Sequence, residues 1–562
     1  MKKIFTSRAL ALILVLAMAV SLLTISASAT TISKVSIAEG EPVAIDWTQA
    51  GTTYTGTIVN SATLSSTVYS MPSSFTLWTE GEATFEAGTG ITVTAIGASA
   101  DETNYSYKVD VSGIASGSTA TLVVTISSGT YTVALPSATP ISAGGTKPTS
   151  VLSYAPLGQF ARGNGWGSIY SNYANVAGST ASDALVKFAT GTGYESTGVS
   201  LGAFGGYIDF YFQGGITNDA KNPYGVDFVI YGNAFNANPE AGAVQVSEDG
   251  ITWYELAGSM YYDGNFNYTG EAGASRISNA YTGTLRNATI SYSQDSVIKA
   301  TVKDASGATK INAAQFVAST AWWPTVAKGY PAIAAHINSN ATSTSNVQVT
   351  CNDTLFSSTG LTLIPDSNTT ADYAFGYADV TPNGSPASYG DAVNPYTPYT
   401  SSKTGGDGFD LEWAVDITTG LPVDVTDMTF RYVRVYSAVL DNGMFGETST
   451  EVCGIFTTAN KATASVGTTA APTTVTVGGT AVTLSKTASG IQPVTIPKNT
   501  ATDVVVTGGS NSHIYINNTY GAGTATNSFT LARNATQIVR VIVQDNSTAQ
   551  PYVGYVMLKG GK

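Results

Sequence analysis

Acidic side chains concentrate in one part of this chain, where their spacing suggests a metal site. Residues 361–456 contain 13 Asp and Glu against three Lys and Arg. Asp407 and Asp410 follow a pair of glycines, and Glu447 follows another glycine in a turn-rich segment. Calcium takes about six to eight oxygen ligands from carboxylates and loop carbonyls, and glycines let a loop turn its carbonyls inward. We therefore predict Asp407, Asp410 and Glu447 as ligands of a structural Ca²⁺, provided that the loops meet in space.

The same acids have two other interpretations. Asp407 is also placed to cap a turn, and Glu447 to stay in water or to pair with a nearby arginine. Asp410 and Glu412 are two residues apart, so a strand would project both carboxylates from one face, roughly 7 Å apart. A glycosidase needs two carboxylates about 5–9 Å apart, but any strand with alternating acids offers that spacing. We therefore expect no enzymatic activity.

Exposed aromatic rings are the second candidate chemistry, because a flat ring with polar neighbours suits a sugar-binding face. Trp322 and Trp323 are adjacent. Adjacent residues of an extended chain point to opposite sides, so both rings cannot be buried on one face. Trp166 lies in a glycine-rich run and is the next candidate. Trp253 and Trp413, by contrast, fall within expected strands and are predicted to lie in the core.

The composition excludes several classes of function. A net charge of −13 at pH 7 argues against binding nucleic acid, which needs basic patches, and against docking on anionic lipid. The two histidines, His336 and His513, come close to excluding a His-based zinc site or a Ser-His-Asp triad. The two cysteines, Cys351 and Cys453, form either one disulfide or two isolated buried thiols.

The first 29 residues have the pattern of a secretory signal peptide. A charged start is followed by an apolar run over residues 9–25 and by Ala-Ser-Ala at 27–29. This pattern predicts cleavage before Thr30; the alternative is an uncleaved anchor, for which about 17 apolar residues are barely enough. We therefore expect a secreted, cell-surface-associated protein without membrane insertion after cleavage.

Short runs with period-2 alternation, separated by Gly, Asn, Asp and Ser turns, predict an all-β protein. We expect an Ig-like β-sandwich over residues 30–146 and a linker over 136–150. A central jelly-roll or discoidin-like β-sandwich is expected over 147–456, and a cadherin-like or Ig-like sandwich over 457–562.

Three patterns in the central part are specific enough to test. Residues 207–213 place Ile208, Phe210 and Phe212 on one face of a strand. The Asp-Gly turn between residues 244–246 and 251–256 predicts a hairpin. A further strand is expected over 431–439, with its valines facing the core.

Several phrases of the central part resemble a family of secreted bacterial cell-surface proteins. They are residues 201–206 (LGAFGG), 227–235 (DFVIYGNAF), 253–256 (WYEL), 375–379 (FGYAD), 406–415 (GDGFDLEWAV) and 446–451 (GETSTE). The chain departs from the family pattern at Ala203, where glycine is more usual, and in residues 263–350, which do not align. The resemblance implies a surface β-sandwich with no established enzymatic activity. Asn233, in the Gly-Asn-Ala-Phe phrase, then either shapes a loop or contacts a ligand.

Together these patterns predict a non-catalytic surface protein for recognition or adhesion, with a glycan or cell-wall polymer as partner. Trp322, Trp323, Trp166 and Asn233 are the predicted ligand-binding residues. Two alternatives remain open at this point. One is a surface-layer or matrix component that self-associates, and the other is capture of a small nutrient or cofactor.

Overall fold

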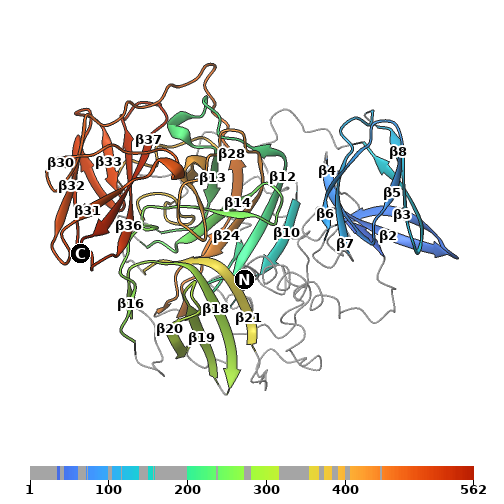
Figure 1. Ribbon diagram of the computed structural model, residues 1–562, viewed down its shortest axis with the longest axis horizontal. Coiled ribbons are helices and arrows are strands. Elements are labelled where there is room, and N and C mark those ends of the chain that lie inside the picture. Colours follow the sequence, from blue (N-terminus) through green and yellow to red (C-terminus); the bar gives the residue numbers. More distant parts are fainter. Residues whose placement is uncertain are drawn as a thin grey trace, which may run out of the picture.

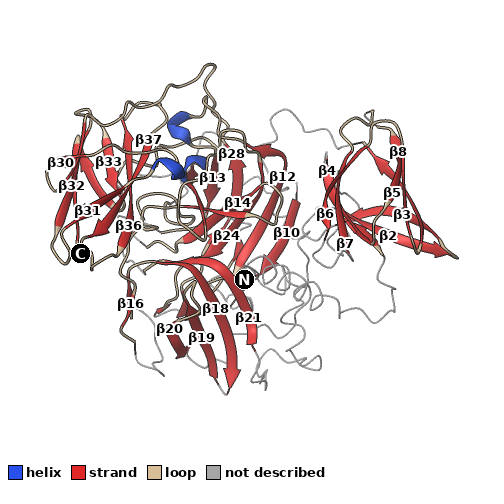
Figure 2. Cartoon of the chain, viewed as in Figure 1, coloured by secondary structure: helices blue, strands red, loops and turns tan. Residues whose placement is uncertain are grey.

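The computed structural model is all-β, as predicted (Figures 1 and 2). It describes residues 34–37, 43–60, 71, 74–98, 104–115, 117–137, 148, 150–155, 157, 199–235, 238–270, 280–295, 297–315, 354–365, 373–382, 390–398, 405–443 and 446–562. Within these ranges the helices are three short 3-10 turns: η3 (Pro223–Gly225), η4 (Leu411–Trp413) and η5 (Ala488–Gly490). None of the residues so described forms a helix long and apolar enough to cross a membrane.

The N-terminal strands form a two-sheet sandwich that stands apart from the rest of the molecule (Figure 1, blue). One sheet has the order β1 (Val35–Ile37), β4 (Ser74–Glu80), β7 (Asn104–Asp110), β6 (Thr92–Ala98). The other has the order β2 (Val43–Ala50), β3 (Thr53–Asn60), β9 (Gly129–Pro136), β8 (Thr119–Ile126), β5 (Thr84–Ala87), with β3 and β9 parallel. Its core is its own, and Tyr131 stacks on Tyr54 at its centre.

A six-stranded antiparallel sheet forms the middle layer of the central part. Its order is β10 (Ser150–Ala155), β12 (Tyr207–Ile216), β24 (Phe430–Ser437), β14 (Gly242–Ser247), β15 (Trp253–Leu256), β23 (Ala414–Asp416). The hairpin of β14 and β15 confirms the Asp-Gly turn. Ile208, Phe210 and Phe212 face one core together, as do Val433 and Val435 of β24, which confirms the face predicted for β12.

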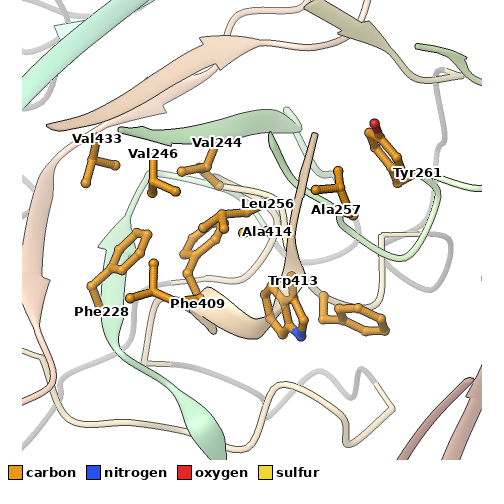
Figure 3. Packing of buried hydrophobic residues seen from close by; sticks show 14 of the residues in the cluster. Phe228, Val244, Val246, Leu256, Ala257, Tyr261, Phe409, Trp413, Ala414 and Val433 are labelled. Atoms are coloured by element: carbon orange, nitrogen blue, oxygen red, sulfur yellow. The ribbon is translucent and has the colours of Figure 1, made fainter. Parts of the chain in front are cut away.

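Two smaller sheets cover the two faces of this middle layer. One has the order β22 (Asp407–Phe409), β13 (Phe228–Tyr231), β28 (Gly454–Thr457). The other has the order β20 (Thr309–Gln315), β19 (Val297–Lys303), β18 (Leu285–Asp295), β21 (Thr354–Leu363). Alternate residues divide between the two cores, since Val244 and Val435 join the first while Ala243 and Tyr436 join the second. Figure 3 shows Phe228 and Phe409 packed beneath Val244 and Val246.

Three two-residue ladders tie loops to this frame. They pair β11 (Val199–Ser200) with β27 (Glu451–Val452), β16 (Asn267–Tyr268) with β17 (Tyr281–Thr282), and β25 (Asn442–Gly443) with β26 (Gly446–Glu447). The first of these ladders fixes the end of the GETSTE phrase.

The C-terminal strands form another two-sheet sandwich with a core of its own. One sheet has the order β30 (Thr480–Ala481), β29 (Thr474–Val477), β32 (Thr502–Thr507), β35 (Thr524–Phe529). The other has the order β31 (Pro493–Ile496), β37 (Tyr552–Gly560), β36 (Thr536–Gln544), β33 (His513–Ile516), β34 (Thr519–Ala522), with β31 and β37 parallel.

The C-terminal sandwich also shares a core with the central part. Its Tyr515, Ile542 and Tyr555 belong to the same buried cluster as Phe375 and Trp413. Such continuity means that the two units bury apolar surface against one another, and that the burial stabilises both.

Arg540, from β36, bonds the C-terminal sandwich to the central part at this junction. It is 1 % exposed and donates through Nη2 to the Gly258 carbonyl at 2.7 Å and through Nη1 to the Ala257 carbonyl. Its guanidinium also lies over the rings of Tyr262 and Phe375, at 5.4 and 5.3 Å from their centroids. A buried cation held by carbonyls and aromatic faces replaces its lost hydration by these contacts.

Candidate metal centre

Three carboxylates from distant parts of the sequence meet beside the three-stranded sheet. Glu240, Asp379 and Glu451 each have a carboxylate oxygen within 4.8 Å of the others. Asp379 is fully buried, Glu451 is 4 % exposed and Glu240 is half-buried. We call these three residues the carboxylate centre.

Backbone pairing brings the three residues together. An isolated antiparallel bridge joins Gly242, at the start of β14, to Ala378 through hydrogen bonds of 2.9 and 2.8 Å. The bridge sets Asp379 beside Glu240, whose N–H donates to the Asp379 carbonyl at 2.9 Å. Glu451 is the first residue of β27 and lies at the same place, although it is far from Glu240 in the sequence.

The Asp379 carboxylate accepts three backbone N–H groups. Oδ1 accepts from Asn233 at 2.6 Å and from Ala234 at 2.8 Å, and Oδ2 accepts from Glu451 at 2.9 Å. Asp379 itself has a left-handed backbone with φ of 61°, a conformation that costs free energy for a non-glycine residue, although Asp adopts it more readily than most. The loops are therefore organised around this one side chain.

Steric contact with Asp379 explains the glycine of the Gly-Asn-Ala-Phe phrase. A Cβ on Gly232 would lie 2.1 Å from Asp379 Oδ1, so only glycine lets the chain pass over the carboxylate. The next residue, Asn233, shapes the loop by donating its N–H to Asp379. Its side-chain Oδ1 is buried and has no hydrogen-bond partner, which leaves one further oxygen near the carboxylate centre.

Burial and mutual repulsion act against ionisation of the carboxylate centre. Burial, together with the charge of Glu451, raises the pKa of Asp379 well above its usual range although backbone N–H groups oppose the shift. Burial and the charges of Glu451 and Asp379 raise the pKa of Glu240 in the same direction. Two arrangements relieve such strain: a proton shared between carboxylates, or a cation bound among them.

Of the acids predicted as metal ligands, Asp407 lies beside this centre. Its Oδ2 accepts the N–H of Val380, the residue after Asp379, at 3.1 Å, and its charge adds to the raised pKa of Asp379. Glu447 belongs by its backbone to β26, but its side chain lies outside the described residues.

Asp410 lies elsewhere, in a second buried acidic group. Its Oδ1 caps the Glu412 N–H at 2.8 Å, and its Oδ2 accepts the Tyr396 hydroxyl at 3.2 Å. Burial is the first cause of its raised pKa, and the charges of Glu412 and Asp227 add to it. The expectation that Asp410 and Glu412 share one face of a strand is wrong, because residues 411–413 form the 3-10 turn η4.

The predicted aromatic residues divide between described and undescribed parts of the chain. Trp413 is fully buried, as expected for a core residue, while Trp253 is half-buried beneath the Arg434 guanidinium, 4.4 Å from the ring centroid. Trp166, Trp322 and Trp323 lie outside the described residues.

Sequence reasoning did not single out the three members of the carboxylate centre. A signal was available, because Asp379 and Glu451 end two of the conspicuous phrases, FGYAD and GETSTE. Glu240 has no such signal, since it follows a proline in a loop and is recruited only by the bridge between Gly242 and Ala378.

Comparisons with known proteins add no family to this description: no protein-family model matches the chain, and the search among curated proteins found no match.

Proposed function

We propose that this protein is a secreted, non-catalytic recognition or adhesion protein of the bacterial cell surface, whose central sandwich binds a structural Ca²⁺. The carboxylate centre supports the calcium part. It offers oxygens of three carboxylates, which are ligands of a hard cation, and the Asn233 residue that donates its N–H to Asp379 has a buried amide oxygen without a hydrogen-bond partner. An ion there would join loops that are more than 200 residues apart in sequence, because Glu240 and Glu451 belong to different ends of the central part.

A structural role fits this site better than a catalytic one. Asp379 is fully buried and engaged by three backbone N–H groups. A general acid or base has to reach its substrate within hydrogen-bond distance, and this side chain is enclosed by its own loops. The partner that we propose is a glycan or cell-wall polymer, which fits the sequence expectation of export and the resemblance to secreted bacterial cell-surface proteins.

Calcium binding is tested by calorimetry and by thermal unfolding of the mature chain, residues 30–562, in Ca²⁺, in Mg²⁺ and in chelator. We expect Ca²⁺ at a hundred times its dissociation constant to stabilise the fold by about 2.7 kcal/mol. Glu240→Gln and Glu451→Gln should lose this response. Glu86→Gln, an exposed glutamate of the N-terminal sandwich, is the matched control and should keep it.

A proton shared between the carboxylates of the centre predicts a different response to Ca²⁺ and to substitution than calcium binding does. If Glu240 holds a proton against Glu451, Ca²⁺ leaves the melting temperature unchanged, and Glu240→Gln preserves stability in every buffer. That result would overturn the calcium proposal. Saturable binding to a glycan and wall-polymer panel tests the recognition proposal separately, and its replacement by concentration-dependent polymers would favour self-assembly.

A further inference from the structure

A pocket lies where the central part, its four-stranded sheet and the C-terminal sandwich meet. Its volume is about 490 Å³, within the range of about 300–1,000 Å³ usual for small-ligand sites. Three walls form it: residues 284–287 at the start of β18, residues 417–420 after β23, and residues 530–538 leading into β36. Two walls belong to the central part and the third to the C-terminal sandwich, so the pocket exists only where these two are joined.

The pocket has an apolar floor and a polar rim. Tyr262, Leu285 and Ile538 are buried in its floor. The rim is rich in hydroxyl and amide side chains that face solvent wholly or in part: Asn265, Asn287, Thr418, Thr419, Thr530, Thr536 and Gln537. Asp263 and Arg286 are the charged residues of the described lining, and their charges cancel.

A β-bulge directs Arg286 into this pocket. On β18 Leu285 and Ala288 are three positions apart, while their partners on β21, Leu363 and Leu361, are two positions apart. The additional residue places Arg286 and Asn287 in the bulge, and Asn287 takes a left-handed backbone with φ of 50°. Bulges of this kind re-aim side chains beside binding sites.

The guanidinium of Arg286 is held by neutral groups. It lies over the rings of Tyr261 and Tyr262, at 5.4 and 5.5 Å from their centroids. A Cβ on Gly420 would lie 2.3 Å from its Nη1, so glycine is required for the arginine to fit there. Within the described part of the chain, no carboxylate forms an ion pair with it, and its donors are therefore not consumed by a salt bridge.

Tyr262 fixes the three walls relative to one another. Its hydroxyl donates to the Gly420 carbonyl at 2.8 Å, and its own carbonyl accepts Nε2 of Gln537 at 3.1 Å. The shared core and Arg540 hold the same junction from beneath. A pocket fixed in this way loses little entropy on binding, which favours even a small ligand.

We propose that this junction pocket binds a neutral saccharide of one or two rings. Each sugar hydroxyl both donates and accepts, so it needs donors and acceptors in alternation. Arg286 and the amide NH₂ groups supply the donors, while the amide carbonyls and Asp263 supply the acceptors. An acidic sugar gains no net attraction, because the charge of Arg286 is offset by Asp263 in the lining and Asp416 adds a further negative charge near Tyr261. The inference deepens the proposed recognition function by naming its ligand class and site.

The test uses the mature chain, residues 30–562, with glucose, galactose, mannose, N-acetylglucosamine and their disaccharides, and with glucuronate as the charged match of glucose. Saturation-transfer NMR identifies a ligand and calorimetry gives its affinity. We expect at least one neutral sugar to bind, and glucuronate to bind at least tenfold more weakly than glucose.

Three variants locate the binding. Arg286→Lys keeps the charge but loses the planar fork of donors, and should weaken binding at least tenfold. Thr536→Trp fills the pocket from its exposed rim and should abolish binding. Thr526→Trp, an exposed threonine of the other sheet of the C-terminal sandwich, is the control and should bind as the unaltered chain does.

Binding by none of the neutral sugars, or binding that survives Thr536→Trp, overturns the proposal. The calcium response of the same preparations separates this failure from failure of the calcium proposal. A chain that keeps its stabilisation by Ca²⁺ but binds no sugar retains the proposed metal centre and loses the saccharide pocket. A chain that binds sugar without a calcium response has the opposite outcome.

Discussion

At the scale of residues, the side chain of Asp379 holds two loops together. Its carboxylate collects three N–H groups from two loops, and Gly232 passes over it with no room for a side chain. The geometry of the carboxylate centre thus depends on the absence of one Cβ.

Gly232→Ala is expected to destabilise the fold by about 1–3 kcal/mol, the usual cost of overpacking, and to weaken Ca²⁺ binding with it. The reason is that the new Cβ, 2.1 Å from Asp379 Oδ1, forces the carboxylate to move. Thermal unfolding and calcium calorimetry measure the two effects. Gly97→Ala is the control, since a Cβ there meets nothing within 4 Å; equal behaviour of the two variants would contradict the prediction.

Glu255 makes stability depend on pH. It is 2 % exposed and accepts hydrogen bonds from the Tyr436 hydroxyl at 2.8 Å and from Gln245 at 2.9 Å. Burial raises the pKa of Glu255 from 4.5 to about 8. Between these two pH values the folded chain holds a proton that the unfolded chain has released, so this group's contribution to stability falls as pH rises.

We therefore predict that Glu255→Gln flattens the fall of melting temperature between about pH 4.5 and 8. Differential scanning calorimetry across that range measures the slope. Glu86→Gln, at an exposed position of β5, should leave the slope as it is. If melting temperature falls with pH equally in Glu255→Gln and in the unaltered chain, the Glu255 carboxyl does not cause the pH dependence.

The sequence indicated which types of residue could form a site, but not which of them lie close together in the structure. The acidic region was recognised, and Asp407 of that region lies beside the centre. Asn233, predicted either to shape a loop or to contact a ligand, donates its N–H to Asp379. Glu240 was missed because a bridge between Gly242 and Ala378, more than a hundred residues apart, recruits it. No local pattern carries such a contact, since it depends on which loops the sheets bring together.

At the scale of elements, strands β12 and β24 are joined by an ion pair as well as by their ladder. Asp209 faces Arg434 in register, and the two form a bidentate pair with Nε–Oδ1 at 2.7 Å and Nη2–Oδ2 at 2.9 Å. The Arg434 guanidinium also lies over the rings of Tyr207 and Trp253. The pair is largely shielded from solvent, with side chains 21 % and 8 % exposed.

Asp209→Asn is expected to cost about 3 kcal/mol, because it leaves a largely buried guanidinium without its counter-charge. Urea unfolding gives the free energy of unfolding. Glu80→Gln breaks the exposed pair with Lys34 and should change stability by less than about 1 kcal/mol. A similar small change for Asp209→Asn would mean that water reaches Arg434.

Period-2 patterns predicted strands well where a strand is flanked by two sheets. Ile208, Phe210 and Phe212 alternate in β12 and lie in one core. The same reasoning failed at residues 411–413, where alternating acids suggested a strand and η4 formed instead. There Asp410 caps the turn through its side chain, and such a local hydrogen bond competes with the ladder.

At the scale of the whole molecule, two bodies are visible rather than three. The N-terminal sandwich shares no core cluster with the rest of the described residues, whereas the C-terminal sandwich, besides its own core, shares a second one with the central part. Sequence patterns predicted the all-β class of these units but not this continuity, because surface and interface residues of a strand look alike without their neighbours.

Calorimetry of residues 30–562 should therefore show two transitions, one for the N-terminal sandwich and one for the central part with the C-terminal sandwich. Arg540→Ala should lower the free energy of unfolding of the second transition alone, by about 3–5 kcal/mol. The reason is that the substitution leaves a void and unpaired carbonyls at the junction. Lys559→Ala, at an exposed position of β37, is the control. Three independent transitions, or an effect of Arg540→Ala on the first, would contradict this view.

The shared core also bears on how such a gene can change. A recombination break near residue 457 would separate Tyr515 and Tyr555 from Phe375 and Trp413, so the halves on either side have to be inherited as one block. A break between β9 and β10 separates no residues of a common core. Exchange, loss or duplication of the first sandwich therefore disturbs no shared core, while substitutions among the shared core residues of the remainder have to match across its junction.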